Sequence, residues 1–143
     1  MVHPNECTAA DSLDTPFEAF LDSKAAAGGG EDRTGTYVSQ LERVVGAWIE
    51  QMEKRGVDSF ARLDERALAQ WVDEYLAKRV RAHRAGESGI SAESANTYYD
   101  YVSAYLEYCR NWGIIDENPA GTAVARDPLP DRPSRQASQQ QFW

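Results

Sequence analysis

Residues 91–120, SAESANTYYDYVSAYLEYCRNWGIIDENPA, decide the fold class of this chain. Ser91 is a typical helix N-cap residue, and Gly113 is a typical helix stop. Between them, apolar residues recur every three or four positions, which places them on one face of a helix. The expected inner face consists of Ala95, Tyr98, Val102, Tyr105, Leu106, Cys109 and Trp112. The stretch therefore predicts a long amphipathic helix that packs against other helices.

Two helices are predicted in the first part of the chain. The first begins with Thr15 as N-cap and Pro16 in its first turn, and it ends at the glycines 28–30. The second is stopped by Gly56 after a basic last turn. Its residues at three- and four-residue steps share one apolar face, which comprises Tyr37, Leu41, Val44, Val45, Trp48, Ile49 and Met52.

A third helix is predicted between these two and the last one. Asp64 is its expected N-cap, and Gly86 and Gly89 end it. Its expected inner residues are Leu68, Trp71, Val72, Tyr75, Leu76 and Val80. No segment alternates with period two for long enough to predict a strand, so the fold class is all-α, a bundle of four helices with short loops.

The expected organisation is one domain with a tail at each end. Residues 1–13 are interpreted as a flexible leader and residues 14–125 as the helical domain. Residues 126–143, rich in proline and glutamine, are interpreted as a linker toward a further domain.

The composition bears on partners and source. The formal net charge is −8, and arginine outnumbers lysine twelve to three. An acidic surface repels nucleic acid at low salt, but lysine-poor, acid-rich surfaces are typical of halophilic proteins, in which salt screens charge. The densest basic run comprises Lys78, Arg79, Arg81, His83 and Arg84. Two interpretations stay open for it, a DNA-facing patch or cations that offset a helix dipole.

Several classes of function have no support in the sequence. There is no apolar run of about 20 residues and no secretory signal, so a cytoplasmic protein without membrane contact is expected. Cys7 is assigned to a polar tail and Cys109 to an apolar helix face, both as reduced thiols. No catalytic constellation, metal site, cofactor motif or small-molecule site is predicted. The aromatic residues Tyr98, Tyr101, Tyr105, Tyr108 and Trp112 are interpreted mainly as core, with a base-stacking platform as the alternative.

The order of motifs resembles that of phage-integrase-type tyrosine recombinases. In that family the second helix carries Thr-x-x-x-Tyr-x-x-x-Leu-x-x-Phe-x-x-Trp; here the threonine, Thr34, stands one place late and Val44 replaces the aromatic residue. The remaining motifs follow in the family's order and are Leu63-Asp64, Ser91-x-x-Ser94, Asn96, Tyr105-Leu106, Trp112-Gly113-Ile114-Ile115 and Asn118-Pro119-Ala120. Over residues 15–125 the chain thus resembles the N-terminal core-binding domain of a phage integrase or Xer-type recombinase, and the composition points to a halophilic archaeon.

The resemblance implies a SAM-like orthogonal bundle that forms half of a C-shaped clamp on duplex DNA. The N-terminal halves of the second and fourth helices would approach the DNA, in keeping with the unpaired N–H groups and positive dipole of helix N-termini. The implied DNA-binding residues are Arg33, Thr34, Thr36, Arg43, Ser91, Ser94, Asn96 and Thr97. Thr97 and Ser103 stand at positions that are often basic in relatives, and Asp100 lies between them, so weak phosphate binding at low ionic strength is expected.

The resemblance also places the chemistry outside these residues. The family's catalytic arginines, His-x-x-Arg element and tyrosine nucleophile belong to a domain after the linker, so this fragment is not expected to be an enzyme. Its implied partners are duplex DNA and other recombinase subunits assembled on that DNA. Two alternatives stay open: a helical protein–protein interaction module that binds no DNA, and a stand-alone accessory DNA-binding protein.

Overall fold

The computed structural model describes residues 2–27 and 36–131, and within these ranges every regular element is helical. The long elements are α1 (Phe17–Ala27), α2 (Thr36–Lys54), a helical stretch over residues 65–84, and α5 (Ala92–Asn111). Short 3₁₀ turns are η1 (Pro4–Glu6), η2 (Phe60–Arg62) and η4 (Pro119–Gly121), and α6 spans Ala123–Arg126. The all-α prediction is confirmed.

The predicted helix boundaries agree with the observed ones to within about two residues. Asp64 caps the third helix, since its Oδ1 accepts a hydrogen bond from the Ala67 amide at 2.8 Å. Ser91 caps α5 in the same way through the Ser94 amide at 3.1 Å. Gly113 ends α5 with φ +76°, a left-handed backbone conformation that residues other than glycine rarely adopt.

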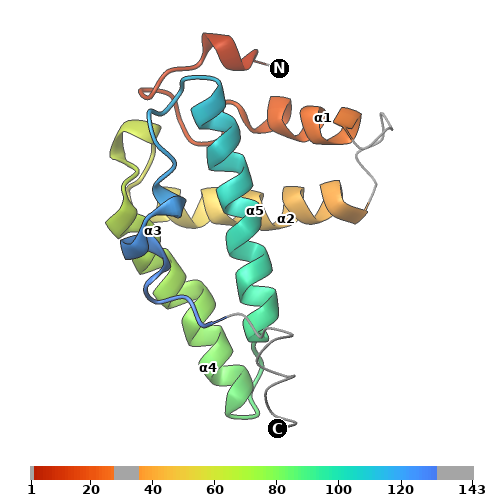
Figure 1. Cartoon of the computed structure of the whole chain (residues 1–143), viewed down its shortest axis with the longest axis vertical. Coiled ribbons are helices and arrows are strands. Elements are labelled where there is room, and N and C mark those ends of the chain that lie inside the picture. The colour runs from red at the N-terminus through yellow and green to blue at the C-terminus, as the bar shows by residue number, and fades with distance from the viewer. Residues whose placement is uncertain (1, 28–35, 132–143) are drawn as a thin grey trace, which may run out of the picture.

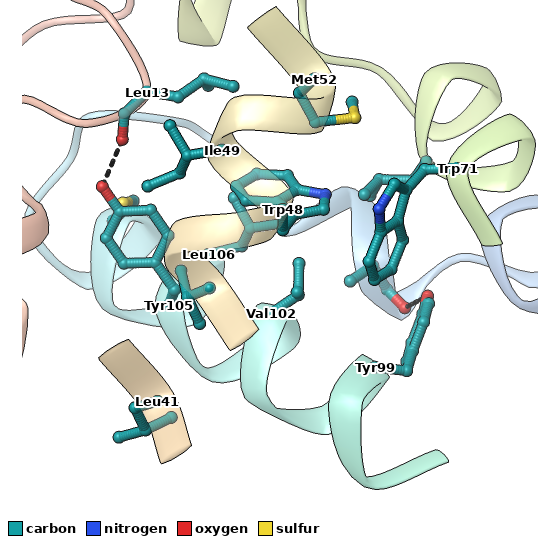
Figure 2. Close-up of a cluster of buried hydrophobic side chains, with 14 of the residues drawn as sticks. Leu13, Leu41, Trp48, Ile49, Met52, Trp71, Tyr99, Val102, Tyr105 and Leu106 are labelled. Atoms are coloured by element: carbon teal, nitrogen blue, oxygen red, sulfur yellow. Dashed lines mark hydrogen bonds between the residues drawn. The ribbon is translucent and has the colours of Figure 1, made fainter. Parts of the chain in front are cut away.

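Helix α5 lies at the centre of the molecule. Figure 1 shows α2 crossing behind α5, with α1 above α2 and beside the upper part of α5, and the 65–84 stretch on the opposite side of α5. Trp48 of α2 and Tyr105 of α5 are both fully buried where the two helices meet, with ring centroids 6.4 Å apart (Figure 2). Phe20 of α1 packs on the same tyrosine, with the two ring centroids 5.1 Å apart. The periodic apolar residues of three helices thus converge on one core.

The inner face of α5 differs from the expectation at three positions. Tyr99, which was not predicted to face inward, is fully buried, whereas Tyr98 is only half-buried and Trp112 is 43% exposed. The reason is tertiary: the chain after Gly113 runs back along α5 and covers the flank that carries Tyr99. The Tyr99 hydroxyl donates a hydrogen bond to the Ala120 carbonyl. The sequence after Ala120 also forms α6, an element that was not predicted.

The third helix contains a π-helical insertion. It consists of α3 (Glu65–Trp71), the π segment η3 (Val72–Ala77) and α4 (Lys78–Arg84), and the backbone at both junctions keeps helical angles. A π turn closes hydrogen bonds between residues five apart instead of four, so it holds more residues per turn than an α turn, and it is rare in proteins. The apolar pattern alone did not indicate this change of period.

The ends of the described chain pack more closely than the terms leader and linker imply. Leu13 is fully buried, and its carbonyl accepts a hydrogen bond from the Tyr105 hydroxyl. Cys7, assigned from sequence to a polar tail, is 7% exposed, so that assignment is wrong; it and Cys109 are buried free thiols. At the other end, the Pro130 carbonyl accepts a hydrogen bond from α5 at 2.8 Å. Residues 132–143 of the predicted linker lie outside the described residues.

The buried tyrosines predict a loss of stability in alkali. Burial raises the pKa of Tyr99 from 10.0 to about 12, an effect partly offset by the Arg126 guanidinium above its ring, and burial also raises the pKa of Tyr105. Because the folded state holds these protons more tightly, their stabilising effect is complete below about pH 10 and is lost as the pH rises through about 12. Urea unfolding followed by circular dichroism across this range measures the decline. The free energy of unfolding of Tyr99→Phe should fall less steeply with rising pH than that of the unmodified chain. Equal slopes of free energy against pH would contradict this account.

Candidate nucleic-acid interface

The residues proposed from sequence for the start of α2 are only partly described. Arg33 and Thr34 lie outside the described residues. Thr36 is the first residue of α2, and its side chain also lies outside the described part. Arg43, two turns further along, is exposed, and its Nη2 donates a hydrogen bond to Gln40 Oε1 at 2.6 Å. Arg43 is therefore the predicted residue of α2 whose position can be argued from contacts.

Two predicted residues at the start of α5 form a capping pair. Ser91 Oγ accepts the Ser94 amide and donates to Ser94 Oγ at 3.1 Å, and both side chains are half-buried. This pairing satisfies one of the amides that a helix start leaves open. Both serines have a structural role, and a polar ligand at the helix start would meet hydroxyls already in use.

Asn96 does not occupy the position expected of a DNA contact. Its side chain is 5% exposed, and its Nδ2 donates to the Ala92 carbonyl at 2.9 Å and to the Pro130 carbonyl at 2.8 Å. Its amide therefore ties the start of α5 to the segment that follows α6. The sequence predicted that this asparagine contacts a base or a phosphate. Because its side chain is enclosed, its role in this structure is instead to hold two segments together.

Thr97, the last predicted residue, lies on a stripe of α5 that meets α2. Residues at steps of three and four, namely Ser94, Thr97, Tyr98 and Tyr101, share this stripe, and all are half-buried. From α2, the Arg43 guanidinium lies 5.6 Å from the centroid of the Tyr98 ring, and the Tyr37 ring lies 5.8 Å from that of Tyr101. We call the set Tyr37, Arg43, Ser94, Thr97, Tyr98 and Tyr101 the α2–α5 seam.

The seam presents hydrogen-bond donors on an aromatic base. An arginine stacked on a tyrosine ring keeps its guanidinium N–H groups directed outward, in the plane of the group. Two of these N–H groups can donate parallel hydrogen bonds to one phosphate. Burial raises the pKa of Tyr37, with a smaller contribution from Tyr101, so its hydroxyl stays protonated at neutral pH. Tyr37 remains 49% exposed, which leaves its ring open to a stacking partner. The interpretation of the aromatic residues as mainly core is confirmed for Tyr105, which is fully buried, and Tyr98, Tyr101 and Tyr108 pack half-buried against the same core, whereas Trp112 is exposed.

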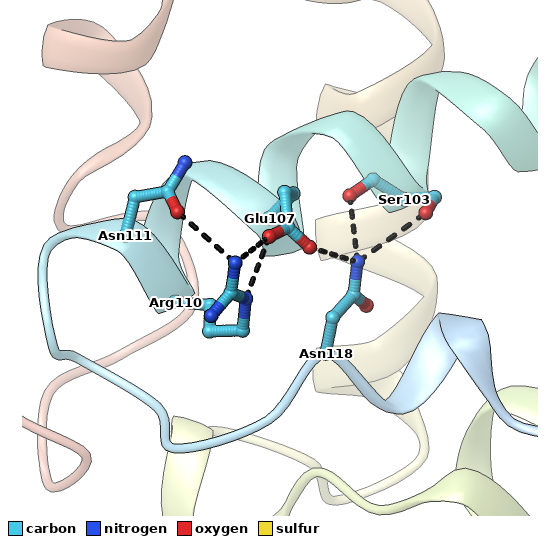
Figure 3. Close-up of polar contacts among 5 residues, drawn as sticks. All are labelled: Ser103, Glu107, Arg110, Asn111 and Asn118. Carbon is cyan, nitrogen blue, oxygen red and sulfur yellow. Dashed lines mark hydrogen bonds and ion pairs between the residues drawn. The ribbon is translucent and has the colours of Figure 1, made fainter.

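Ser103, at a position often basic in recombinases, faces a different partner. Asn118 Nδ2 donates to the Ser103 carbonyl at 3.1 Å and to the Ser103 hydroxyl and Glu107 Oε2 at 3.3 Å each (Figure 3). Hydrogen bonds from Arg110 and Asn118 lower the pKa of Glu107. This cluster fastens the Asn118-Pro119-Ala120 turn to α5, so the motif has a clear structural role here.

The basic run of α4 is exposed to solvent. Lys78, Arg79, Arg81, His83 and Arg84 are all exposed, and Arg81 lies 3.8 Å from Asp73. Within the described residues, no group of three or more His, Cys, Asp or Glu side chains can hold a metal ion. Over the same residues, no helix has the length and apolarity needed to cross a membrane.

Comparisons with known proteins add no relative. The chain matches no protein-family model, no curated protein and no solved structure. Arguments about its function therefore rest on its own residues and on the order of motifs in its sequence.

Proposed function

We propose that this chain is a DNA-binding domain whose α2–α5 seam contacts the backbone of a DNA duplex. The observation that carries the proposal is the packing of Arg43 on Tyr98 beside Thr97, which puts a cation, an aromatic surface and a hydroxyl on one face. Phosphate contacts of this kind position a protein on DNA without reading its sequence.

The proposal extends to the role of the domain in a larger enzyme. The recombinase-like order of motifs supports a SAM-like core-binding domain that clamps duplex DNA for integration and recombination. In that role it would position the duplex and assemble with other recombinase subunits, while a separate domain cut and rejoined the strands. The all-helical architecture and the long central α5 agree with this proposal at the level of fold class.

Fluorescence anisotropy on a labelled random duplex tests the proposal directly. The net charge of −8 opposes binding at low salt, whereas added salt weakens both this repulsion and the attraction at the seam. The titration therefore runs from low salt to molar KCl, with folding checked by circular dichroism at each step. Saturable binding at any salt concentration supports the proposal, and a folded protein that binds at none overturns it for this domain.

Two adjacent residues of α5 separate contact from structure. Thr97→Ala should weaken duplex binding about two- to fivefold through loss of one hydroxyl contact, with no change in melting temperature. Asn96→Ala should instead lower the free energy of unfolding by about 1–3 kcal/mol, because two buried hydrogen bonds are lost. Anisotropy and thermal melts on both variants provide the measurement. A Thr97→Ala variant that melts early but binds normally would assign the seam a structural role.

A second candidate function is binding of a protein partner. The observation that favours it is a hollow of about 780 Å³ between the N-terminal segment, the start of α3 and the turn after α5. Leu63 and Ile115 lie in it beside four acidic residues, Asp64, Glu65, Asp116 and Glu117. Absence of DNA binding in the titration would make this candidate the leading one.

A further inference from the structure

A second feature of interest lies beside the seam, between α2, the π segment and α5. It is a cleft of about 90 Å³, about three times the volume of a water molecule in the liquid. Arg43 and Tyr98 of the seam line it together with Gln51, Tyr75 and Arg79, and the remaining lining residues are apolar, namely Val44, Ala47, Trp71 and Leu76. We call it the Arg43–Arg79 cleft.

The side chains that line this cleft are suited to an anion. Two arginines line it, and no aspartate or glutamate does, although acidic residues outnumber basic ones in the chain by 23 to 15. Gln51 Oε1 accepts the Trp71 indole N–H at 2.6 Å, which orients the amide and leaves its NH₂ group as a further donor. The hydroxyls of Tyr75 and Tyr98 add donors that need no ionisation.

The cleft is held in shape by contacts on each side. The Arg55 guanidinium lies 5.6 Å from the Tyr75 ring centroid and also pairs with Glu74. The turn from α4 to α5 packs on Arg79 itself, where the Ile90 amide donates to the Arg79 carbonyl at 3.2 Å. A Cβ on Gly89 would lie 2.1 Å from that carbonyl oxygen, so this close approach requires glycine.

The π segment adds an independent indication. Tyr75 and Leu76, which line the cleft, belong to the six residues Val72–Ala77 that depart from α-helical spacing. Single π turns within helices occur frequently at functional sites, because they change the direction of the side chains that follow. Arg79 is one of the first residues after this turn.

From these observations we infer that the Arg43–Arg79 cleft binds a phosphate group, and that in the DNA complex this group belongs to the duplex backbone. The assignment of this phosphate to the DNA backbone rests on the proposed function. The phosphate site itself is argued from the cleft residues alone. It adds Arg79, Gln51 and Tyr75 to the binding surface and extends the DNA contact from the α2–α5 seam onto α4.

The first arm of the test uses the duplex and a matched pair of variants. Arg79→Gln should weaken duplex binding about three- to tenfold near 0.1 M salt and lower the slope of log K against log salt by about one. Arg81→Gln, also exposed on α4 but outside the cleft, removes the same charge and should change binding less than twofold. Equal effects of the two variants would overturn the cleft as a DNA contact.

The second arm uses inorganic phosphate without DNA. Chemical shifts of the Gln51 side-chain amide and of the α4 backbone amides should move with added phosphate at constant ionic strength, and Arg79→Gln should abolish the movement. If phosphate changes these chemical shifts but Arg79→Gln leaves duplex affinity unchanged, the site binds free anions and the DNA part of the inference fails. If phosphate moves them and the unmodified chain binds no duplex, the proposed function fails while the site stands. No movement in a folded protein overturns the site.

Discussion

Replacement of Trp48 by alanine is expected to destabilise the domain by about 3–5 kcal/mol. The side chain is fully buried at the crossing of α2 and α5, and removal of an indole from such a position leaves a cavity that the surrounding residues fill only partly. For a domain of this size the loss corresponds to a melting temperature lower by roughly 10–20 °C. Urea and thermal unfolding monitored by circular dichroism measure it.

Trp48→Phe is the matched control for the cavity. The indole Nε1 is buried and has no hydrogen-bond partner among the described residues, so phenylalanine keeps most of the packing and removes an unsatisfied donor. Phenylalanine should therefore cost much less than alanine. If both substitutions cost the same, the position depends on a contact of the indole nitrogen and the cavity argument is wrong.

Reversal of charge at Arg43 is expected to have the largest effect on DNA binding. Arg43→Glu removes a cation from the α2–α5 seam and puts an anion beside the backbone phosphates. At a separation of about 5 Å and a dielectric between those of water and of a protein surface, the change amounts to about 2–3 kcal/mol, or roughly 30- to 150-fold in Kd. Duplex anisotropy near 0.1 M salt measures the change, which should shrink as salt rises.

Arg66→Glu provides a control with the same change in net charge. Arg66 is exposed in the first turn of α3, where a carboxylate is favoured by the helix dipole, and it lines the acidic hollow rather than the seam. Its reversal should lower affinity only slightly and should not lower stability. Equal losses for the two variants would mean that binding responds to overall charge and that the seam is not the contact surface.

The fold class could be predicted from sequence because helix signals are local. The caps at Asp64 and Ser91, the glycine stop at Gly113 and the apolar spacing of α2 from Leu41 to Met52 each depend on neighbouring residues, and each is observed; Tyr37, predicted on the same face, is exposed instead. The inward turn of Tyr99 and the burial of Cys7 could not be predicted in this way. Both depend on segments from distant parts of the chain that pack against α5. The apolar spacing within one helix does not predict which other segments pack on that helix.

The candidate site was predicted less completely than the fold. Arg43 of α2 packs on Tyr98, the neighbour of Thr97 in α5, whereas Asn96 is enclosed by the segment near Pro130. Tyr98 and Tyr101 fit the helical period of a core, and only their partners on α2 distinguish them from buried tyrosines. The π segment carries no sequence signal of its own, so Arg79 was recognised only as part of a basic run.

The hydrogen bond between Tyr105 and Leu13 has a consequence for the order of folding. It joins residues 92 positions apart, and closing a loop of that length costs about 4 kcal/mol of chain entropy if nothing else has formed. Contacts of α2 and of the 65–84 stretch with α5 close shorter loops and are therefore expected earlier. The N-terminal segment would dock last, onto a core already assembled, and would be the first part to detach when the domain opens.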